Sequence, residues 1–384
     1  MKIALAHKRL DLKGGTERDF FRTAEGLRDL GHEVHLFCCE FGVSPPEGVQ
    51  IHRVPYLALG RTARLLSFAL LGPKVILSHR CDVVVSFGRM IRQDVLRSGG
   101  GTHRAFLQKM EQGGKVHRWL WHRLSLYHRS VLAIERMQYS PQGHEKILAV
   151  SREVKREIVS NYQVPGNKIS VIYNGVDHER FHPRGRERAR DRIRRQWGIP
   201  PDAPLVLFVG SGFQRKGLDR LLKVWPSPRL SGIYLLVVGE DAQWNRRHSW
   251  GERQADGRIV FAGRQEDVEA YYGAADLLAL PARQEAFGNV VLEALASGLP
   301  VLVSKVAGAA EVLTGSLEQG ILEIPDDPLE LETKLLGLLD RDRWPWISEE
   351  ARRLGERYSW RNHFRELEQC LLKVAEQDRR EVSP

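Results

Sequence analysis

Short apolar runs that alternate with amphipathic segments recur along the chain and constrain its fold more than any other feature. The run at 82–86 is almost continuously apolar, which is typical of a strand buried on both faces of a parallel sheet. Strands that alternate with helices predict βαβ units. Because the pattern restarts at 205–209, this chain of 384 residues is expected to form two doubly wound α/β domains.

The loop signals Asn174-Gly175 and Pro200-Pro201 lie between the two series of strands. The first domain is therefore predicted to cover 1–174 and to be joined by a last helix at about 358–384. The second domain is predicted to cover 175–357. Between the two loop signals, 186–197 is expected to form a helix whose arginine-rich face is exposed.

Charge and cysteine content restrict the partners and the compartment. The net charge of +10 implies an acidic partner, and the cations concentrate at 104–136 and 184–195. No run approaches the roughly 20 apolar residues of a membrane span, and the apolar start is too short for a signal peptide. We therefore expect a cytoplasmic protein. The cysteines lack metal or redox spacing and are expected to be buried or partly buried thiols: Cys38, Cys39, Cys81 and Cys370.

The most specific motif is Glu285-Ala-Phe-Gly-Asn-Val-Val-Leu-Glu293, between a predicted strand at 276–281 and a small-residue helix from Asn289. Ligands bind at the carboxyl ends of strands in such sheets. The start of a helix suits phosphate or sugar-nucleotide oxygens. The two carboxylates suit the hydroxyls of a polyol, because they accept hydrogen bonds.

A second loop, 211–217, follows the first strand of the second domain. Its adjacent Arg215 and Lys216 stand just before a helix and are suited to hold a diphosphate. The loop does not match the G-x-x-x-x-G-K-[ST] pattern of a Walker A motif. The alternative is a solvated loop that happens to carry two cations.

Two glycine-rich segments mark the first domain. Gly14-Gly15 precedes the first helix and either lets the backbone approach a ligand or forms an ordinary tight loop. The dinucleotide pattern G-x-G-x-x-G is absent there. Asp19 would project from the first helical turn, where an acid also simply favours the helix dipole. The triplet 99–101 ends a strand-like segment and precedes His103, for which we favour a role in a site.

These segments resemble the motifs of the retaining glycosyltransferases of family 4, which have the GT-B fold. The resemblance covers nearly the whole chain. Within the family, 14–20 and 212–217 are most similar to the bacterial lipopolysaccharide core glucosyltransferases that glucosylate heptose. His103 departs from that group, in which we expect an acidic residue nearby, and fits the general family pattern. The resemblance is carried by Gly14-Gly15, Gly99 to His103, Tyr173-Asn-Gly-Val-Asp177, Arg215-Lys216-Gly217, Glu285 to Glu293 and Ala296-Ser-Gly-Leu-Pro300.

The resemblance implies two Rossmann-like domains that face each other across a cleft, and a nucleoside-diphosphate sugar, a UDP-sugar, as donor. It implies same-face transfer without a metal or other cofactor, because Arg215 and Lys216 would neutralise the diphosphate. Glu293 would bind the ribose and Glu285 the sugar. The other implied donor-site residues are Gly14, Gly15 and Asp19 in the first domain, the Phe287, Gly288 and Asn289 backbone, and His103 near an outer sugar hydroxyl.

The implied acceptor is a lipopolysaccharide core or similar lipid-linked glycan at the inner face of the inner membrane. The segment 115–129 mixes cations with aromatic residues, which suits an anionic membrane surface, although a basic domain helix is the alternative. A peripheral membrane protein is therefore expected. The candidate membrane residues are Arg118, Trp119, Trp121, Arg123 and Arg129.

Two other functions fit parts of the sequence. A sugar-nucleotide epimerase of the same architecture is disfavoured by the Glu-x7-Glu block together with the Arg-Lys pair. A basic nucleic-acid-binding protein is disfavoured because no recognised module is present and 184–195 lacks interleaved stacking aromatics. Asp340-Arg-Asp342 matches a D-x-D metal motif only superficially and is expected to be a surface turn.

Overall fold

The computed structural model describes residues 1–12, 14–111, 125–242, 244, 253–254 and 257–382. The chain divides into two compact units. The first consists of Met1–Tyr173 with Arg361–Pro384, and the second consists of Asn174–Trp360. Each unit is a sheet of mostly parallel strands covered by helices, so the prediction of two doubly wound α/β domains is confirmed.

The first unit contains, within its described residues, a seven-stranded parallel sheet in the order β5-β3-β1-β6-β7-β8-β9. The order reverses between β1 and β6, which places a ligand crevice at the carboxyl ends of these two strands. The strands are β1 (Lys2–Ala6), β3 (Glu33–Cys38), β5 (Gln50–Arg53), β6 (Val83–Ser86), β7 (Val95–Ser98), β8 (Lys146–Ala149) and β9 (Ile169–Val171), with β2 (Arg9–Leu10) and β4 (Glu40–Phe41) paired separately.

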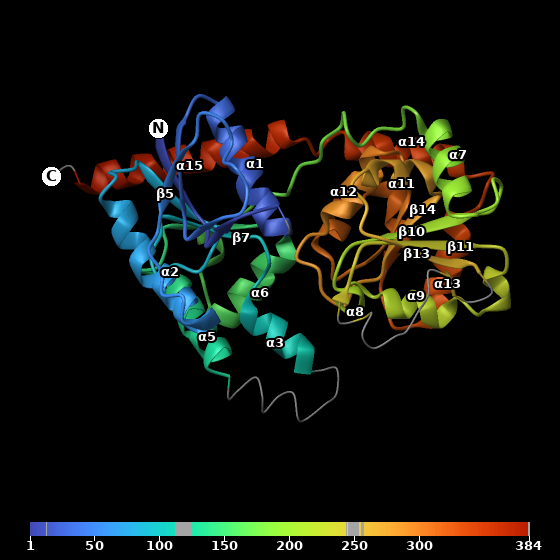
Figure 1. Ribbon diagram of the computed structural model, residues 1–384, viewed down its shortest axis with the longest axis horizontal. Helices are drawn as coiled ribbons and strands as arrows, with labels where there is room; N and C mark the ends of the chain where they lie inside the picture. Colours follow the sequence, from blue (N-terminus) through green and yellow to red (C-terminus); the bar gives the residue numbers. More distant parts are fainter. Residues whose placement is uncertain (13, 112–124, 243, 245–252, 255–256, 383–384) are drawn as a thin grey trace. The chain divides into compact units, whose positions relative to one another are not determined.

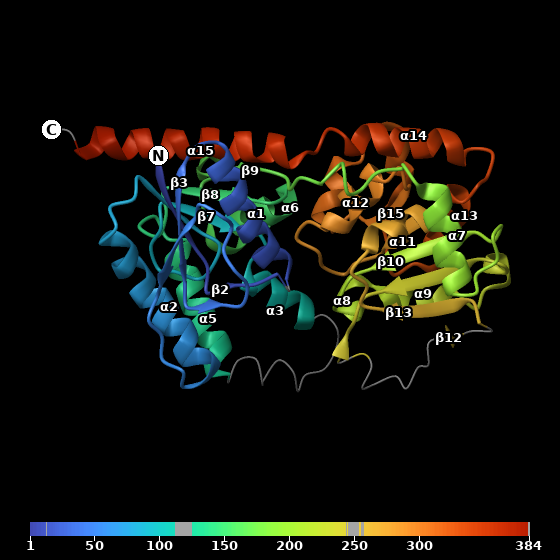
Figure 2. The ribbon, with the colours of Figure 1, turned by 45° about the horizontal axis from the view of Figure 1, so that its top comes forward.

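Helices cover both faces of this sheet, and α2 lies beside α5 in both views (Figures 1 and 2). The last helix, α15, packs on the first unit through Leu367, Leu371 and Val374, whose spacing places them on one helix face. The contact with α1 is close, because a Cβ on Gly26 would lie 2.2 Å from the Phe364 ring. The helices are α1 (Gly15–Asp29), α2 (Gly60–Leu77), α3 (His103–Glu111), α5 (Leu126–Gln138), α6 (Arg152–Tyr162) and α15 (Trp360–Val382), with a 3-10 turn at Gly166–Lys168.

The second unit repeats this plan, with the sheet order β12-β13-β11-β10-β14-β15-β16 over its described residues. All neighbours are parallel except the edge strand β12. The order reverses between β10 and β14. The strands are β10 (Leu205–Val209), β11 (Tyr234–Val238), β12 (Arg253–Gln254), β13 (Ile259–Gly263), β14 (Leu277–Leu280), β15 (Val301–Ser304) and β16 (Ile321–Leu322).

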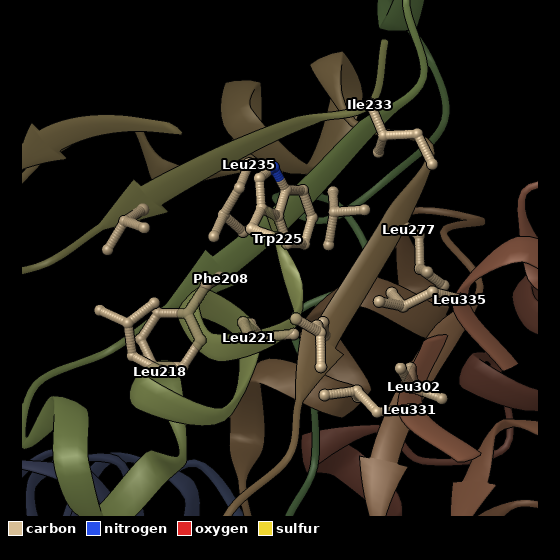
Figure 3. Close-up of a cluster of buried hydrophobic side chains, with 14 of the residues drawn as sticks. Phe208, Leu218, Leu221, Trp225, Ile233, Leu235, Leu277, Leu302, Leu331 and Leu335 are labelled. Carbon is tan, nitrogen blue, oxygen red and sulfur yellow. The ribbon is translucent and has the colours of Figure 1, made fainter. Parts of the chain in front are cut away.

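The core of the second unit joins the sheet to the helices on one of its faces (Figure 3). Trp225, at the end of α9, is completely buried beside Phe208 and Leu235. The helices are α7 (Arg186–Gln196), α8 (Phe213–Lys216), α9 (Leu218–Val224), α11 (Val268–Ala274), α12 (Asn289–Ala296), α13 (Pro328–Leu338) and α14 (Trp344–Gly355), with 3-10 turns at Pro228–Leu230, Gly308–Val312 and Gly315–Gly320.

Helix α7 corrects one prediction. Its exposed arginine-rich face exists, but the opposite face carries arginines that bind the carboxylate of Asp276. Arg190 and Arg194 donate to Asp276 at 2.7 and 2.8 Å, and Arg186 lies 3.7 Å away. Arg194 is only 1% exposed and also donates to the backbone carbonyl of Ala203 at 2.6 Å. The spacing of four residues brings these three side chains to one face.

The four cysteines are free thiols that are buried or partly buried, as predicted. Burial raises the pKa of the Cys39 thiol to about 11.

Replacing Arg194 by methionine should lower the free energy of unfolding by about 3 kcal/mol, because it leaves Asp276 and several buried carbonyls without a donor. Arg195→Met is the matched control on the exposed face, with a side chain 81% exposed, and should change stability by less than about 0.5 kcal/mol. Urea unfolding measures both. Equal stability of the two variants would show that the Asp276 cluster does not hold α7 in place.

Candidate active site

The two predicted loops of the second unit follow β10 and β14, which are hydrogen-bonded neighbours on either side of the reversal in strand order. The loop after β10 leads into α8, which ends with Arg215 and Lys216. The loop after β14 carries Glu285 and leads into α12. Parallel strands end at one edge of the sheet, so the predicted cations and the predicted carboxylate meet there.

Glu285 binds both cations through one carboxylate oxygen. Its Oε2 lies 2.6 Å from Lys216 Nζ and 3.1 Å from Arg215 Nη1. Arg215 Nη1 also donates to the Gln284 carbonyl at 2.8 Å. The Glu285 side chain is only 14% exposed, and that of Lys216 is 10% exposed. The sequence motifs are thus one cluster in space.

Burial of Glu285 favours its neutral form, but the charges of Lys216 and Arg215 and their hydrogen bonds outweigh this effect. The pKa of Glu285 is therefore lower than the usual 4.5, and the carboxylate is ionised at neutral pH. The cluster holds two positive charges against one negative charge. It can therefore accept an anion beside the carboxylate.

Two glycines allow the loops to come this close. Gly217 has a φ of +81°, and a Cβ there would lie 1.9 Å from the Pro281 carbonyl oxygen, so α8 packs directly on the chain that follows β14. Gly288 has a φ of +99° just before α12, where a Cβ would meet the Glu285 side chain at 3.2 Å. Only glycine adopts such conformations without strain.

The backbone from Glu285 to Phe287 is fixed by the loop after β15. The amide of Gly308 donates to the Glu285 carbonyl at 3.1 Å, and that of Ala309 donates to the Phe287 carbonyl at 2.8 Å. At the start of α12, Asn174 donates its side-chain amide to Asn289 Oδ1 at 2.8 Å. The predicted residues Phe287, Gly288 and Asn289 thus form a rigid turn before a helix N-terminus.

Glu293 lies on α12 and is held by a tyrosine that the sequence interpretation did not select. Tyr272, on α11, is completely buried and donates its hydroxyl to Glu293 Oε2 at 2.6 Å. Burial and the neighbouring carboxylate raise the pKa of Tyr272 well above its usual value. Because no local motif marks Tyr272, only its packing against α12 reveals this contact.

Asp241 is another site residue that was missed. It follows β11 and accepts hydrogen bonds from the Phe213 amide at 2.9 Å and from the Trp244 amide at 3.0 Å. Its carboxylate therefore caps the first turn of α8, the helix that carries Arg215 and Lys216. The available signal was an acid just beyond the carboxyl end of a buried strand.

The first unit contains a cavity of about 430 Å³ with a mixed polar and apolar lining, at the carboxyl ends of β1, β6 and β7. His103 lines this cavity together with Thr16 and Glu17 of α1. The glycine triplet and His103 are thus brought to the start of α1. The remaining polar lining includes His7, Lys8, Arg89 and Glu135, and the apolar lining includes Leu65, Phe68, Phe87, Leu96 and Phe106.

The other predicted residues of the first unit are placed differently. Gly14 caps α1 with an extended φ of −111°, and Gly15 is the first residue of the helix with no atom near a built Cβ, so neither is required by a positive φ. Asp19 is only 4% exposed and its Oδ2 lies 3.3 Å from Arg97 Nε. This buried ion pair joins α1 to β7. Asp19 thus has a structural contact, and its predicted role in donor binding stays a prediction.

Asp340-Arg-Asp342 is an exposed turn, as predicted, and the part of the chain that the structure describes contains no cluster of three or more potential metal ligands. Of the candidate membrane residues, Arg129 is exposed on α5, whereas Arg118, Trp119, Trp121 and Arg123 lie outside the described residues. Among the described helices, none is long and apolar enough to cross a membrane.

Two family models match the chain, one in each half. The model of Glycosyltransferase Family 4 matches residues 13–180. The model of Glycosyl transferases group 1 matches residues 189–358.

The chain is similar to curated glycosyltransferases over most of its length. It is 27% identical to the lipopolysaccharide glucosyltransferase WaaG of Escherichia coli over 303 residues, which cover 78% of this chain and 79% of that protein. It is 29% identical to an uncharacterized glycosyltransferase of Methanocaldococcus jannaschii over 367 residues, 89% of this chain and 90% of that protein.

Solved structures share the fold. The crystal structure of WaaG, a glycosyltransferase involved in lipopolysaccharide biosynthesis, matches with a TM-score of 0.77 and 23% identity, over 96% of this chain and 99% of that one. Anabaena HepE in complex with UDP-glucose matches with a TM-score of 0.71 and 17% identity, over 97% of this chain and 100% of that one. These likenesses show two Rossmann-like domains of the GT-B type.

Replacing Glu285 by glutamine should lower the free energy of unfolding at pH 7 by about 1–3 kcal/mol, because two partly buried cations lose their carboxylate. The folded pKa of Glu285 is lowered, so its stabilisation is fully present above the unfolded value near 4.5 and is lost as the pH falls through the lower folded value. The difference between parent and variant should therefore shrink between pH 5 and pH 3. Thermal unfolding over this range measures it.

Glu323→Gln is the matched control, because Glu323 forms an equally short 2.6 Å ion pair with Lys305 but is 55% exposed. It should change stability little at any pH. A loss in Glu285→Gln that stays constant from pH 7 to pH 3 would contradict the assigned charge state.

Proposed function

The chain belongs to glycosyltransferase family 4, with the GT-B fold, and we propose that it is a retaining, metal-independent hexosyltransferase. It moves glucose from UDP-glucose to a sugar of a lipopolysaccharide core or similar cell-envelope glycan. The observation that carries this proposal is the cluster of Arg215, Lys216 and Glu285 at the switch point of the second sheet. The choice of donor and acceptor is supported by the names of the relatives, a lipopolysaccharide glucosyltransferase and a protein solved with UDP-glucose.

Arg215 and Lys216 stabilise the diphosphate as it leaves the sugar. Charge that is already in place where negative charge develops commonly contributes more to catalysis than any other single effect. Glu285 holds both cations and, being ionised, can accept hydrogen bonds from sugar hydroxyls. The turn at Gly288 and the start of α12 add amide donors and the positive end of a helix dipole. These groups supply the positive charge that a divalent metal supplies elsewhere, so we propose that none is required.

Glu293 binds the ribose hydroxyls of the nucleotide. Its carboxylate is oriented by the buried Tyr272, which bonds to Oε2 at 2.6 Å. An ionised carboxylate held in one orientation can accept hydrogen bonds from two neighbouring hydroxyls. The free nucleotide and the donor share this contact, so it contributes to the affinity for both.

The transfer occurs on one face of the sugar. The acceptor oxygen attacks the anomeric carbon from the side on which the diphosphate leaves, the bond from that carbon to the phosphate oxygen breaks, and the acceptor proton passes to the departing phosphate. Glu285 is not a nucleophile in this scheme, because its contacts with Lys216 and Arg215 commit it to orienting the site. His103 lies near an outer hydroxyl of the donor sugar.

In excess EDTA, the parent should be fully active, whereas Lys216→Ala should lower turnover by about 10²–10³-fold, as expected for loss of one preorganised transition-state donor. Glu293→Ala should weaken the binding of UDP itself. Turnover is followed by UDP release from UDP-glucose with heptose-terminated lipopolysaccharide core, and affinity is measured by calorimetry with UDP.

Lys334→Ala removes a lysine of α13 that pairs with Glu330 and serves as the control, with turnover near that of the parent. Full turnover in Lys216→Ala would refute the diphosphate role. Loss of parent activity in EDTA that Mg²⁺ or Mn²⁺ restores would refute metal independence. Unchanged UDP affinity in Glu293→Ala would refute the ribose contact.

The acceptor we propose is lipid-linked, so the enzyme works at an anionic membrane surface on the cytoplasmic face of the inner membrane. The sequence supports this through the basic and aromatic segment 115–129, whose described part includes the exposed Arg129. Each cation near such a surface contributes on the order of 1 kcal/mol to binding.

The parent should therefore sediment with anionic liposomes, not with neutral ones, and less as salt increases. Changing Arg118, Arg123 and Arg129 to glutamate should abolish sedimentation and leave UDP affinity intact. The charge-matched control changes Arg184, Arg188 and Arg195, which are exposed in the second unit, and should still sediment. Equal binding by the two triple variants would show that net charge, not this segment, attracts the membrane.

A further inference from the structure

Glu135 of α5 is a buried carboxylate, with a side chain only 2% exposed, that accepts hydrogen bonds at both oxygens. Oε1 accepts from the amide of His103 at 2.6 Å and from Arg89 at 3.0 Å. Oε2 accepts from the amide of Arg104 at 3.1 Å and from the Tyr162 hydroxyl at 2.5 Å. Two of these four donors are the first two amides of α3.

Glu135 therefore caps α3 from a different helix. The first amides of a helix have no partner within the helix, and a negative charge beside them is favourable. The first turn of α3 contains no acidic residue of its own. The preceding residues are the glycine triplet, with a φ of +75° at Gly101. Glycine restricts its backbone dihedral angles less than any other residue, because it has no Cβ. The carboxylate of Glu135 holds the first two amides of α3, and the Thr102 hydroxyl accepts from the third, that of Ala105, at 3.1 Å. These contacts together fix the position of His103.

The ring of His103 is held by a second residue of α5. His103 Nε2 lies 2.9 Å from His128 Nδ1, and the two rings lie edge to edge, with centroids 5.1 Å apart and planes 16° apart. His128 and Glu135 are seven residues apart, which is about two helical turns, so they lie on one face of α5. One helix face thus holds both the backbone and the ring of His103.

We propose that His128 and Glu135 are positioning residues, which place the His103 imidazole for sugar transfer. His103 and Glu135 line the cavity of the first unit, whereas His128 is not among the lining residues. His128 consequently acts through His103 rather than on a ligand. The inference rests on the proposed role of His103 beside the donor sugar, and it explains why a flexible glycine triplet can precede that residue.

Misplacing a reacting or orienting group by about 1 Å can cost on the order of 10²-fold in rate. His128→Phe keeps an aromatic ring at this position but removes the hydrogen bond, and should lower kcat with UDP-glucose by about tenfold to a hundredfold. The KM for UDP-glucose and the affinity for UDP should change little. His128→Asn, whose amide reaches the position of Nδ1, should recover most of the loss. A merely structural role would not produce this rescue.

Glu135→Gln tests the backbone contact, because an amide group places donors against the amides of α3. It should lower kcat by a similar factor, and Glu135→Asp should restore part of it. Glu332→Gln is the control for the stability cost, since Glu332 is also buried and accepts from Ser227 and Arg229 but lies on α13. His79→Phe is the control for His128, as a half-buried histidine of the same unit.

A double-mutant cycle with His103→Ala separates this inference from the proposed function. We expect His128→Phe to have no further effect on kcat once His103 is alanine. If the two losses multiply, His128 does not act through His103, and the positioning proposal is overturned while the role of His103 stands. If His103→Ala retains the parent kcat, both the role of His103 and the positioning proposal are overturned, and the glycosyltransferase assignment is unaffected.

Histidine NMR provides a readout that requires no donor. In protein labelled with ¹⁵N-histidine, the ring nitrogen signals of His103 should shift in His128→Phe and return toward the parent in His128→Asn. Unchanged His103 signals would overturn the positioning proposal. If the parent shows no turnover with UDP-glucose, the proposed donor is rejected. The His103 ring signals then decide alone whether His128 positions His103.

Discussion

The organisation of the second unit depends on one ion-pair cluster, in which Glu285 holds Lys216 and Arg215 where β10 and β14 end. The two strands are neighbours, and Gly217 lets the two following loops pack in direct contact. A carboxylate and two cations at this partly buried place interact more strongly than they would in water. The excess positive charge is therefore already in place, which is the condition for electrostatic catalysis of phosphate departure in the function that we propose.

Buried carboxylates also form such contacts in the first unit, where they join helices and strands near the cavity. Glu135 caps α3, and Asp19 joins α1 to Arg97 of β7. Burial and the nearby Arg97 lower the pKa of His363 to about 4, so this histidine of α15 is neutral at pH 7 and bonds to the Tyr173 carbonyl. An acidic residue near a predicted loop can thus be engaged within the protein itself, as Asp19 is by Arg97.

The sequence was sufficient to place residues that belong to a local motif next to a predicted strand. The strand–Glu–Gly–helix–Glu block and the Arg-Lys pair each follow a buried strand, and parallel strands bring their carboxyl ends together. Arg215, Lys216 and Glu285 could therefore be placed at the strand ends without the structure. The partners that orient them could not be found. Tyr272 and Asp241 are distant in sequence from the residues that they hold, and neither belongs to a recognisable pattern. His128 and Glu135 were missed for the same reason.

The sequence by itself determined the two sheets, because apolar runs of strand length have to be buried on both faces, and it determined the placement of the main motifs at strand ends. It did not determine which charged side chains are satisfied within the protein. The arginines of α7 illustrate this limit, since Arg194 and Arg195 are adjacent and chemically identical, yet one is buried against Asp276 and the other faces solvent. Only the tertiary structure decides between them, because the energy of a charge depends on the partners and the burial that distant segments provide.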